Sequence, residues 1–255
     1  MARAAPGFAT NAVHAGQQPD PSSGAVMQPI VLATTFQQRS PGEKFPSGHD
    51  YSRSGNPTRA AYEACVAALE GAAHGLAFAS GSAATATIIH LLKAGDNIVV
   101  TDDVYGGTQR YFNQVAARMG LTFDYVDFSA AGAVDAAIRS NPATRMLWIE
   151  SPTNPLLKLA DLRAAAELGN ASKLITVVDN TFMSPFFQRP IELGIDISVN
   201  SVSKYLNGHS DVIGGAVCTS SDDLFSRLKF LQNAIGGVPS PFDCYMVPAP
   251  SICVP

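Results

Sequence analysis

The sequence predicts an α/β fold in which a mostly parallel sheet carries helices on both faces. From Thr58 onward, short apolar runs alternate with longer stretches of helical pattern, and this alternation favours parallel strands joined by helical crossovers. Hydrophobic residues make up 46% of the 255 residues and charged residues 15%, so the chain can bury a sizeable core and is not expected to be disordered. We therefore expect one large domain, preceded by an arm.

The expected elements follow in order along the chain. The first helix, 58–69, is Ala-rich and begins after Asn56-Pro57, which is a typical helix start. Strands are expected at 75–79, 97–101, 122–126, 146–149, 174–178 and 197–201. Later helices are expected at 82–93, 108–119, 131–140 and 159–168. Ligands bind at the carboxyl ends of the strands in such sheets, so one cleft should collect the polar residues that follow these runs.

Residues 1–57 are expected to form an extended arm. They are rich in Pro, Gly, Ser and Gln and show little periodicity, and so long an irregular segment is uncommon inside a compact domain. The arm is therefore expected to wrap over something else, such as another subunit. Residues 58–245 form the expected large domain. Residues 246–255 form an atypical tail, because its prolines cannot continue a helix.

Composition and spacing argue against several classes of protein. The net charge of −4 and the lack of any Lys/Arg run leave no basic face for nucleic acid. No apolar run has the length of a membrane span, and the first ten residues lack the apolar region of a secretory signal. The histidines show no metal-binding spacing. We expect a cytoplasmic protein with no metal, no membrane partner and no nucleic-acid partner, in which the scattered cysteines are reduced: Cys65, Cys218, Cys244 and Cys253.

Lys204 and Asp179 are the main candidates for chemistry. Lys204 follows the apolar run 197–201 and would enter the cleft, where a desolvated lysine is suited to imine formation with an aldehyde cofactor. Asp179 ends the run 174–178 and could face a protonated ring nitrogen, a pairing that recurs in enzymes of pyridoxal 5'-phosphate (PLP). Taken singly, a surface lysine and a helix-capping or loop acid remain open as alternatives.

Three further segments could complete such a cofactor site. Ser80-Gly81-Ser82 joins a strand to a helix, so its N–H groups and the helix dipole favour a phosphate, to which Ser201 and Ser203 could add hydroxyl contacts. Tyr105, followed by two glycines, could stack on a flat heterocycle. The Tyr51-Ser52-Arg53 end of the arm could hold a phosphate. The alternatives are a tight turn, a half-buried aromatic and a solvated surface.

These residues lie in seven ordered motifs that resemble the Cys/Met-metabolism family of PLP-dependent enzymes. The resemblance runs from about Phe8 to Tyr245 and is strongest toward the carbon–sulfur lyases of transsulfuration. The motifs are YSRSGNPT (51–58), FASGSAAT (78–85), DDVYGGTQRYF (102–112), WIESPTNP (148–155), VVDNTFMSPFFQRP (177–190), SVSKYLNGHSDV (201–212) and FLQNAIGGVPSPFDCY (230–245).

The resemblance implies the PLP-dependent transferase-like fold of the aspartate aminotransferase type, fold type I. In that family a C-terminal small domain follows the large one and carries an arginine that clamps the substrate carboxylate. This sequence departs from the family pattern after Tyr245. We therefore expect the C-terminal small domain to be absent, and the chain as given to bind PLP weakly and to have little activity.

The resemblance also implies a role for each matching position. Lys204 would form the imine with PLP and then act as the catalytic base, and Asp179 would pair with the pyridine nitrogen. Tyr105, also implied to be catalytic, would stack on the ring, and Asn154 would contact its phenolic oxygen. The phosphate cup would be formed by Gly81, Ser82, Ser201 and Ser203. The cofactor phosphate of a neighbouring subunit would be contacted by Tyr51 and Arg53, and Arg110 would lie near the substrate.

The implied reaction is a γ-elimination that cleaves cystathionine to cysteine, 2-oxobutanoate and ammonia. The implied partners are a small sulfur amino acid and further copies of the chain, arranged as a dimer of dimers, a homotetramer. Gly107 stands where methionine γ-lyases have a cysteine, which argues against methionine as the main substrate. Two alternatives stay open: cystathionine γ-synthase or a related γ-replacement enzyme, and a catalytically dead subunit that binds PLP or a partner chain.

Overall fold

The fold is built on a seven-stranded, mostly parallel sheet, which confirms the predicted α/β class. The structure is a computed structural model that describes residues 7–247. The strand order is β3-β9-β8-β7-β6-β4-β5, and within the described residues β9 alone in this sheet is antiparallel to its neighbours. The bounds are β3 (His74–Phe78), β4 (Asn97–Thr101), β5 (Thr122–Val126), β6 (Thr144–Glu150), β7 (Ile175–Asp179), β8 (Ile197–Ser201) and β9 (Gly215–Thr219).

All six predicted strands are present, and β9 is an addition. β4, β5 and β8 have the predicted bounds, and the other three differ by one or two residues at each end. The segment of β9 is short, begins with a glycine and contains small residues, so its β propensity is weak. Gly215 is required where β9 passes the end of β3, because a Cβ there would lie 2.3 Å from the carbonyl oxygen of Ser80.

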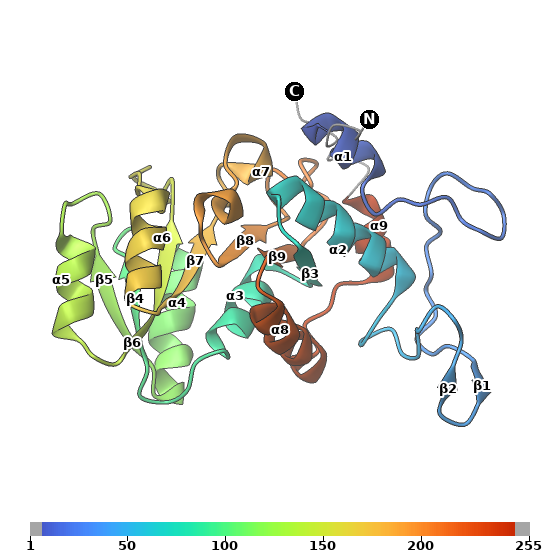
Figure 1. Ribbon diagram of the computed structural model, residues 1–255, viewed down its shortest axis with the longest axis horizontal. Helices are drawn as coiled ribbons and strands as arrows, with labels where there is room; N and C mark the ends of the chain where they lie inside the picture. Colours follow the sequence, from blue (N-terminus) through green and yellow to red (C-terminus); the bar gives the residue numbers. More distant parts are fainter. Residues whose placement is uncertain (1–6, 248–255) are drawn as a thin grey trace.

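Helices cover both faces of the sheet (Figure 1). The apolar side chains alternate between the faces, so Ile98 and Val100 of β4 belong to one buried cluster and Val99 to the other. One face carries α3 (Gly81–Ile89), α4 (Gly106–Gln114) and α8 (Asp222–Ile235). The other face carries α2 (Pro57–Glu70), α5 (Ala133–Ser140), α6 (Leu162–Ala171) and α9 (Pro241–Met246). Shorter helical segments are α7 (Ser184–Phe187), η1 (Ala116–Met119) and η2 (Pro190–Leu193).

Local sequence sets the ends of the helices that border the site. The side chain of Asn56 accepts hydrogen bonds from the N–H groups of Thr58 and Arg59, and Pro57 occupies the first turn, so α2 begins there. The hydroxyl of Ser80 accepts from the N–H of Ala83 and caps α3. Thus α2 begins just after the predicted cofactor segment 51–53, and α3 begins within the predicted cofactor segment 80–82.

The arm was expected to be irregular, but it contains regular secondary structure. It contains α1 (Phe8–His14) and a hairpin of β1 (Gln38–Ser40) and β2 (Glu43–Lys44). Ala12 of α1 packs on Cys65 and Leu69 of α2, a contact too short to give a periodic signal in the sequence. Figure 1 shows the hairpin and the long loop before it standing away from the sheet.

The end of the described chain crosses the predicted boundary at residue 245. α9 ends at Met246, and residues 248–255, which include most of the predicted tail, lie outside the described residues. Among residues 7–247, no helix has the length and apolar character needed to cross a membrane.

Candidate active site

One cavity of about 290 Å³ opens at the carboxyl ends of the parallel strands. It collects residues that follow β3, β4, β6, β7 and β8, which confirms that one cleft gathers these strand ends. Its volume is near the lower end of the ~300–1,000 Å³ that small-molecule sites occupy. The lining residues include eight predicted site residues: Gly81, Ser82, Tyr105, Asn154, Asp179, Ser201, Ser203 and Lys204.

Asp179 is the last residue of β7 and lies in the cavity lining. Its Oδ1 accepts a hydrogen bond of 3.1 Å from the N–H of Thr181. Burial raises the pKa of Asp179, and the hydrogen bonds from Thr181 oppose that rise. A cationic group in the cavity, such as a protonated ring nitrogen, would restore the carboxylate. This carboxyl group is therefore suited to a positively charged ligand atom.

Glu150 is a second buried carboxyl group in the same cavity. It ends β6, next to Asp179 in register, and is 5% exposed. Its Oε2 accepts from the N–H of Tyr105 at 2.9 Å, and its Oε1 accepts from the N–H of Asn154 at 2.8 Å. Burial, and then the neighbouring charge of Asp179, raises the pKa of Glu150. Glu150 thus holds the backbone of two opposite parts of the cavity wall.

The first turn of α3 meets the end of β8 very closely. A Cβ on Gly81 would lie 2.9 Å from the Cβ of Ser201, so only glycine leaves the space between them open. The first N–H groups of a helix have no partner inside the helix and attract anions. The hydroxyl of Ser203 accepts from the N–H of Gly214 at 3.0 Å and donates to its carbonyl oxygen at 3.4 Å. This corner of the cavity has the chemistry of a phosphate cradle.

Tyr105 forms an exposed wall of the cavity at the start of α4. It is 49% exposed, so one surface of its ring is available to a ligand. A Cβ at Gly107 would lie 2.4 Å from Cε1 of Tyr105, so the glycine lets the ring lie over the first turn of the helix. Gly107, where methionine γ-lyases have a cysteine, is thus in contact with Tyr105, the expected stacking residue.

Lys204 lies in the turn after β8 and lines the cavity together with Asp179. Its backbone N–H donates to the carbonyl oxygen of Ser201, which fixes the turn. The lysine is exposed, so the expectation of a desolvated side chain is wrong for this chain. The reason is its position three residues beyond the end of the strand, where solvent reaches the open side of the cavity.

Three predicted site residues lie outside this cavity. Tyr51 and Arg53 are exposed at the end of the arm, and the guanidinium carbon of Arg53 lies 5.4 Å from the centre of the Tyr51 ring. Nη1 of Arg53 donates to the carbonyl oxygen of Asn233 at 2.6 Å. Arg110 is exposed on α4. These side chains contact a ligand only if they move or if the ligand belongs to another chain.

The cavity also contains residues that the sequence analysis does not assign to the site. Glu150 stands among the polar residues that follow a strand, so its position was visible, but its two hydrogen bonds join segments far apart in the sequence. Thr85 is one turn into α3, and Thr181 follows Asp179 directly. The other lining residues have no distinctive sequence signal: Thr108, Pro152, Phe182, Val199 and Ile213.

The donors of the cavity fit a phosphorylated pyridine aldehyde. The glycine-opened helix start suits the phosphate, the half-buried Asp179 suits a ring cation, Tyr105 suits a flat ring, and the amine of Lys204 suits an aldehyde. Within the described residues, no group of three His, Cys, Asp or Glu side chains is arranged to hold a metal ion.

Comparison with known proteins gives close relatives. Cystathionine gamma-lyase of Mus musculus is 59% identical, over 94% of this chain and 60% of the mouse protein. A probable cystathionine gamma-synthase of Herpetosiphon aurantiacus is 53% identical, over 94% of this chain and 74% of that protein. A crystal structure of cystathionine gamma-lyase from Lactobacillus plantarum complexed with L-serine matches with a TM-score of 0.92 and 46% identity, covering 96% of this chain and 63% of that one.

These matches cover nearly all of this chain but a smaller share of each relative. The chain is matched almost from end to end, yet it spans about 60% of the length of the mouse lyase. A family profile described as "Cys/Met metabolism PLP-dependent enzyme" matches residues 9–248. The chain therefore belongs to the Cys/Met metabolism family of PLP-dependent enzymes.

Proposed function

We propose that this chain carries the PLP site of a carbon–sulfur lyase that cleaves cystathionine to cysteine, 2-oxobutanoate and ammonia. The single observation that carries the proposal is the meeting of Lys204, Asp179 and the glycine-opened start of α3 in one cavity. The names of relatives at 55–59% identity support lyase activity. The proposal includes an arm (1–57), a large domain (58–245) and the residues 246–255 beyond it.

The proposed roles follow from the position of each residue. When bound, PLP supplies an electron sink for the charge that develops at the substrate α-carbon. The Nζ atom of Lys204 would hold the cofactor at its aldehyde group and would serve as the base for the substrate α-proton. Asp179 would pair with the protonated ring nitrogen, Tyr105 would stack on the ring and Asn154 would contact its phenolic oxygen. The backbone N–H groups of Tyr105 and Asn154 both donate to Glu150, which would hold them in place. Lys204 and Tyr105 are the proposed catalytic residues.

The phosphate is held from two sides in this proposal. Gly81 and Ser82 offer the first N–H groups of α3, and Ser201 and Ser203 line the same cavity. The arm of a neighbouring copy adds Tyr51 and Arg53, which are exposed and outside the cavity of their own chain. The chain is therefore proposed to work as a homo-oligomer, with sites shared between pairs of subunits, and Arg110 is proposed to lie near the substrate.

Reduction of the holoenzyme with borohydride tests the site, because it fixes PLP on the lysine that holds it. Peptide mapping should place the label on Lys204, and the Lys204→Ala variant should lose the visible absorbance of the bound cofactor. Label on another lysine, with Lys204 unmodified, contradicts the assignment of the residue.

The reaction is tested by product analysis. Incubation with cystathionine should release 2-oxobutanoate and cysteine in equal amounts, at the low rate expected of the chain as given. A second candidate function, γ-replacement, is favoured by the relative named a probable cystathionine gamma-synthase. Formation of cystathionine from cysteine and an activated homoserine, faster than release of 2-oxobutanoate, would favour the synthase. PLP binding without either reaction would favour a catalytically dead subunit.

A further inference from the structure

We propose that Arg59 is a positioning residue that aims Tyr51 and Arg53 at the cofactor phosphate of a neighbouring subunit. The inference rests on the proposed function, because it needs a shared site. Arg59 lies at the start of α2, outside the cavity of its own chain, and neither the sequence motifs nor the cavity assign it a role. Its contacts are those of a side chain that fixes the path of the arm.

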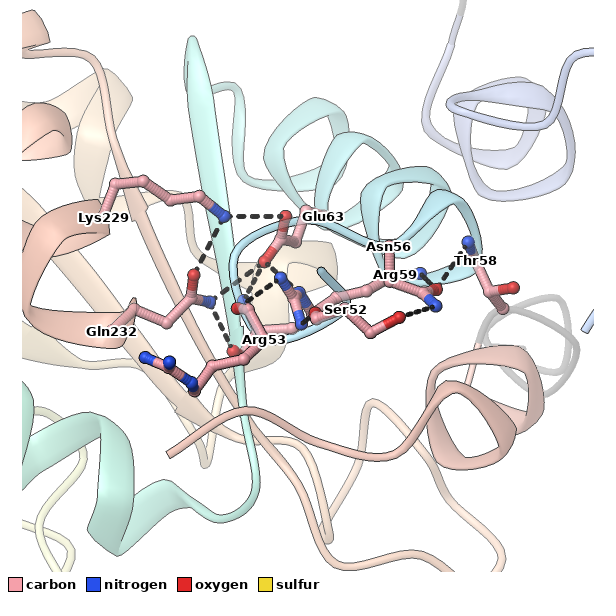
Figure 2. A network of polar contacts seen from close by, with 9 residues as sticks. Ser52, Arg53, Asn56, Thr58, Arg59, Glu63, Lys229 and Gln232 are labelled. Atoms are coloured by element: carbon pink, nitrogen blue, oxygen red, sulfur yellow. Dashed lines mark hydrogen bonds and ion pairs between the residues drawn. The ribbon is translucent and has the colours of Figure 1, made fainter. Parts of the chain in front are cut away.

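Arg59 is buried and binds the backbone of the arm. Its side chain is 3% exposed. Nη1 donates to the carbonyl oxygen of Ser52 at 2.7 Å, and Nη2 donates to the carbonyl oxygen of Arg53 at 3.0 Å (Figure 2). The flat guanidinium group thus fastens two successive peptide units, which fixes their direction as well as their position.

The other edge of the Arg59 guanidinium is joined to the sheet. Nε lies 3.5 Å from Oε1 of Glu63. The same oxygen accepts from the N–H of Ala77 in β3 at 3.0 Å and from Nε2 of Gln232 in α8 at 3.1 Å. Nζ of Lys229 lies 3.9 Å from Oε2 of Glu63 and donates to Gln232 (Figure 2). The peptide units of the arm are therefore tied to β3 through two side chains.

Asn56 holds the same segment from the other side. Its Nδ2 donates to the hydroxyl of Ser52 at 3.1 Å and to the carbonyl oxygen of Val31 at 2.9 Å, while its Oδ1 caps α2. Backbone and buried side chains in this region are thus held tightly. The side chains of Tyr51 and Arg53, in contrast, are exposed, although Nη1 of Arg53 also donates to Asn233 of its own chain. A fixed backbone that presents exposed side chains is the geometry of a contact made outside the chain.

Arg59 and Glu63, which together anchor the arm to β3, also relate the arm to the cofactor site. β3 leads directly to Ser80 and Gly81, where the chain's own phosphate cradle begins. The network therefore sets the position of the arm residues relative to the cradle of the same chain. In a symmetric pair of subunits, each arm is then placed relative to the partner's cradle by the same set of contacts.

The test places the variant on one subunit at a time in mixed dimers of the holoenzyme. One chain carries Arg53→Ala and supplies the only intact lysine, so its pocket is the one observed. The other chain carries Lys204→Ala and supplies the only intact arm. PLP is titrated, and the visible absorbance that requires Lys204 reports the dissociation constant of the observed pocket alone.

A double change, Arg59→Met with Glu63→Gln, removes the anchor without leaving a buried carboxylate unpaired. On the arm-supplying chain it should raise the dissociation constant for PLP roughly tenfold, because misplacing a binding group by about an ångström is costly. On the pocket-supplying chain it should change that constant by less than about twofold, because the amide oxygen introduced by Glu63→Gln can still accept from the N–H of Ala77 and so keeps β3 in place. Arg59→Lys on the arm-supplying chain should give an intermediate value, since one ammonium cannot hold both carbonyls.

The matched control is Arg118→Met, an exposed arginine on η1, which should change nothing on either chain. Loss of affinity that follows the pocket-supplying chain, equal loss on both chains, or no loss at all overturns the inference. If Arg53→Ala alone leaves the PLP affinity of the homodimer unchanged, the shared site of the proposed function fails instead. The two failures are thus distinguished by the first variant measured.

Discussion

At the scale of single residues, the cavity is organised by two carboxyl groups on adjacent strands. Glu150 and Asp179 are neighbours in register, and burial raises the pKa of both. Their charges oppose each other, so the cavity favours a cation between the strand ends. Glu150 uses both oxygens on backbone N–H groups, whereas Asp179 accepts from Thr181 alone of the residues described. Asp179, rather than Glu150, therefore has a carboxylate oxygen left to bind a ligand.

Replacement of Asp179 tests this division of roles. Asp179→Asn keeps the shape of the side chain but cannot carry the charge that a protonated ring nitrogen needs. We expect weaker PLP binding and loss of exchange of the substrate α-proton, measured by NMR in D₂O. Glu150→Gln should retain measurable exchange, because the amide oxygen still accepts from one of the two N–H groups. Exchange at the wild-type rate in Asp179→Asn would refute the role.

A methyl group at Gly81 tests the phosphate cradle. Gly81→Ala places a Cβ 2.9 Å from the Cβ of Ser201, in the space through which an anion reaches the helix start. Loss of one hydrogen bond to a charged phosphate is worth about 1.5–3 kcal/mol, so the dissociation constant for PLP should rise at least about tenfold. The midpoint of thermal unfolding without PLP should also fall, because Ser201 must shift to admit the Cβ, so the dissociation constant is measured at a temperature at which the variant is folded.

The control for this change is Gly106→Ala. Gly106 also occupies the first turn of a helix, but a Cβ there would meet nothing within 4 Å. PLP affinity should be unchanged in this variant. Equal losses at Gly81 and Gly106 would show that the close approach to Ser201 is not what binds the phosphate.

At the scale of elements, α2 begins with the anchor of the arm and ends with a buried acid. Glu70 is fully buried at the carboxyl end of the helix, where the helix dipole disfavours a negative charge. Its Oε1 accepts from Nδ2 of Asn200 at 2.6 Å and from Nδ2 of Asn180 at 3.2 Å. Burial raises the pKa of Glu70 from 4.5 to about 7, although these amides oppose the rise.

Stability should therefore depend on pH through Glu70. Because the folded chain holds the proton more tightly than the unfolded chain, the stabilisation is complete below about pH 4.5 and is lost as pH rises through about 7. Relative to Glu70→Gln, the wild type should lose up to about 3 kcal/mol of unfolding free energy across this window. Urea denaturation at pH 5 and pH 8 measures the difference. Glu167→Gln, at an exposed position, should leave the pH dependence unaltered.

The sequence predicts elements with strong local patterns and misses those that depend on tertiary contacts. The five residues of β4 are all buried, its three central residues are apolar, and both of its ends agree with the prediction. α1 was missed because seven residues with one buried side chain give no period. α8 was given no interpretation, although Ser221 caps it and two acids follow in its first turn. Among these cases, sequence reading fails where the local signal is short.

The candidate site shows the same division. Eight of the predicted site residues line one cavity, because they follow parallel strands whose carboxyl ends lie together. The bond between Glu150 and the N–H of Tyr105 spans 45 positions, so no local pattern reveals it. Arg59 had one visible signal, a cation in the first turn of a helix, where the dipole disfavours it. That misplaced charge has an explanation only once Glu63 is seen beside it.

At the scale of the whole molecule, the face of the sheet that α3, α4 and α8 cover depends on buried side chains such as Trp148. It is the single tryptophan, it is fully buried, and its ring meets that of Phe112 edge-on at 5.3 Å. Trp148→Ala should lower the free energy of unfolding by about 3–5 kcal/mol, because the vacated volume cannot be refilled. Urea denaturation followed by circular dichroism measures this loss. A loss below about 1 kcal/mol would mean that the core around β6 relaxes freely.

The reversed strand β9 also has a consequence for biosynthesis. β3 is the edge strand, and β9 is its only partner in the sheet within the described residues. During translation, the segment that starts the phosphate cradle at Ser80 must therefore wait, unpaired, until residues 215–219 have left the ribosome. The intervening parallel strands can assemble earlier without it, since none of them contacts β3 through the ladder. A nascent chain halted before residues 215–219 have emerged should accordingly present both edges of β3 to chaperones, and one halted after they have emerged should present only the outer edge.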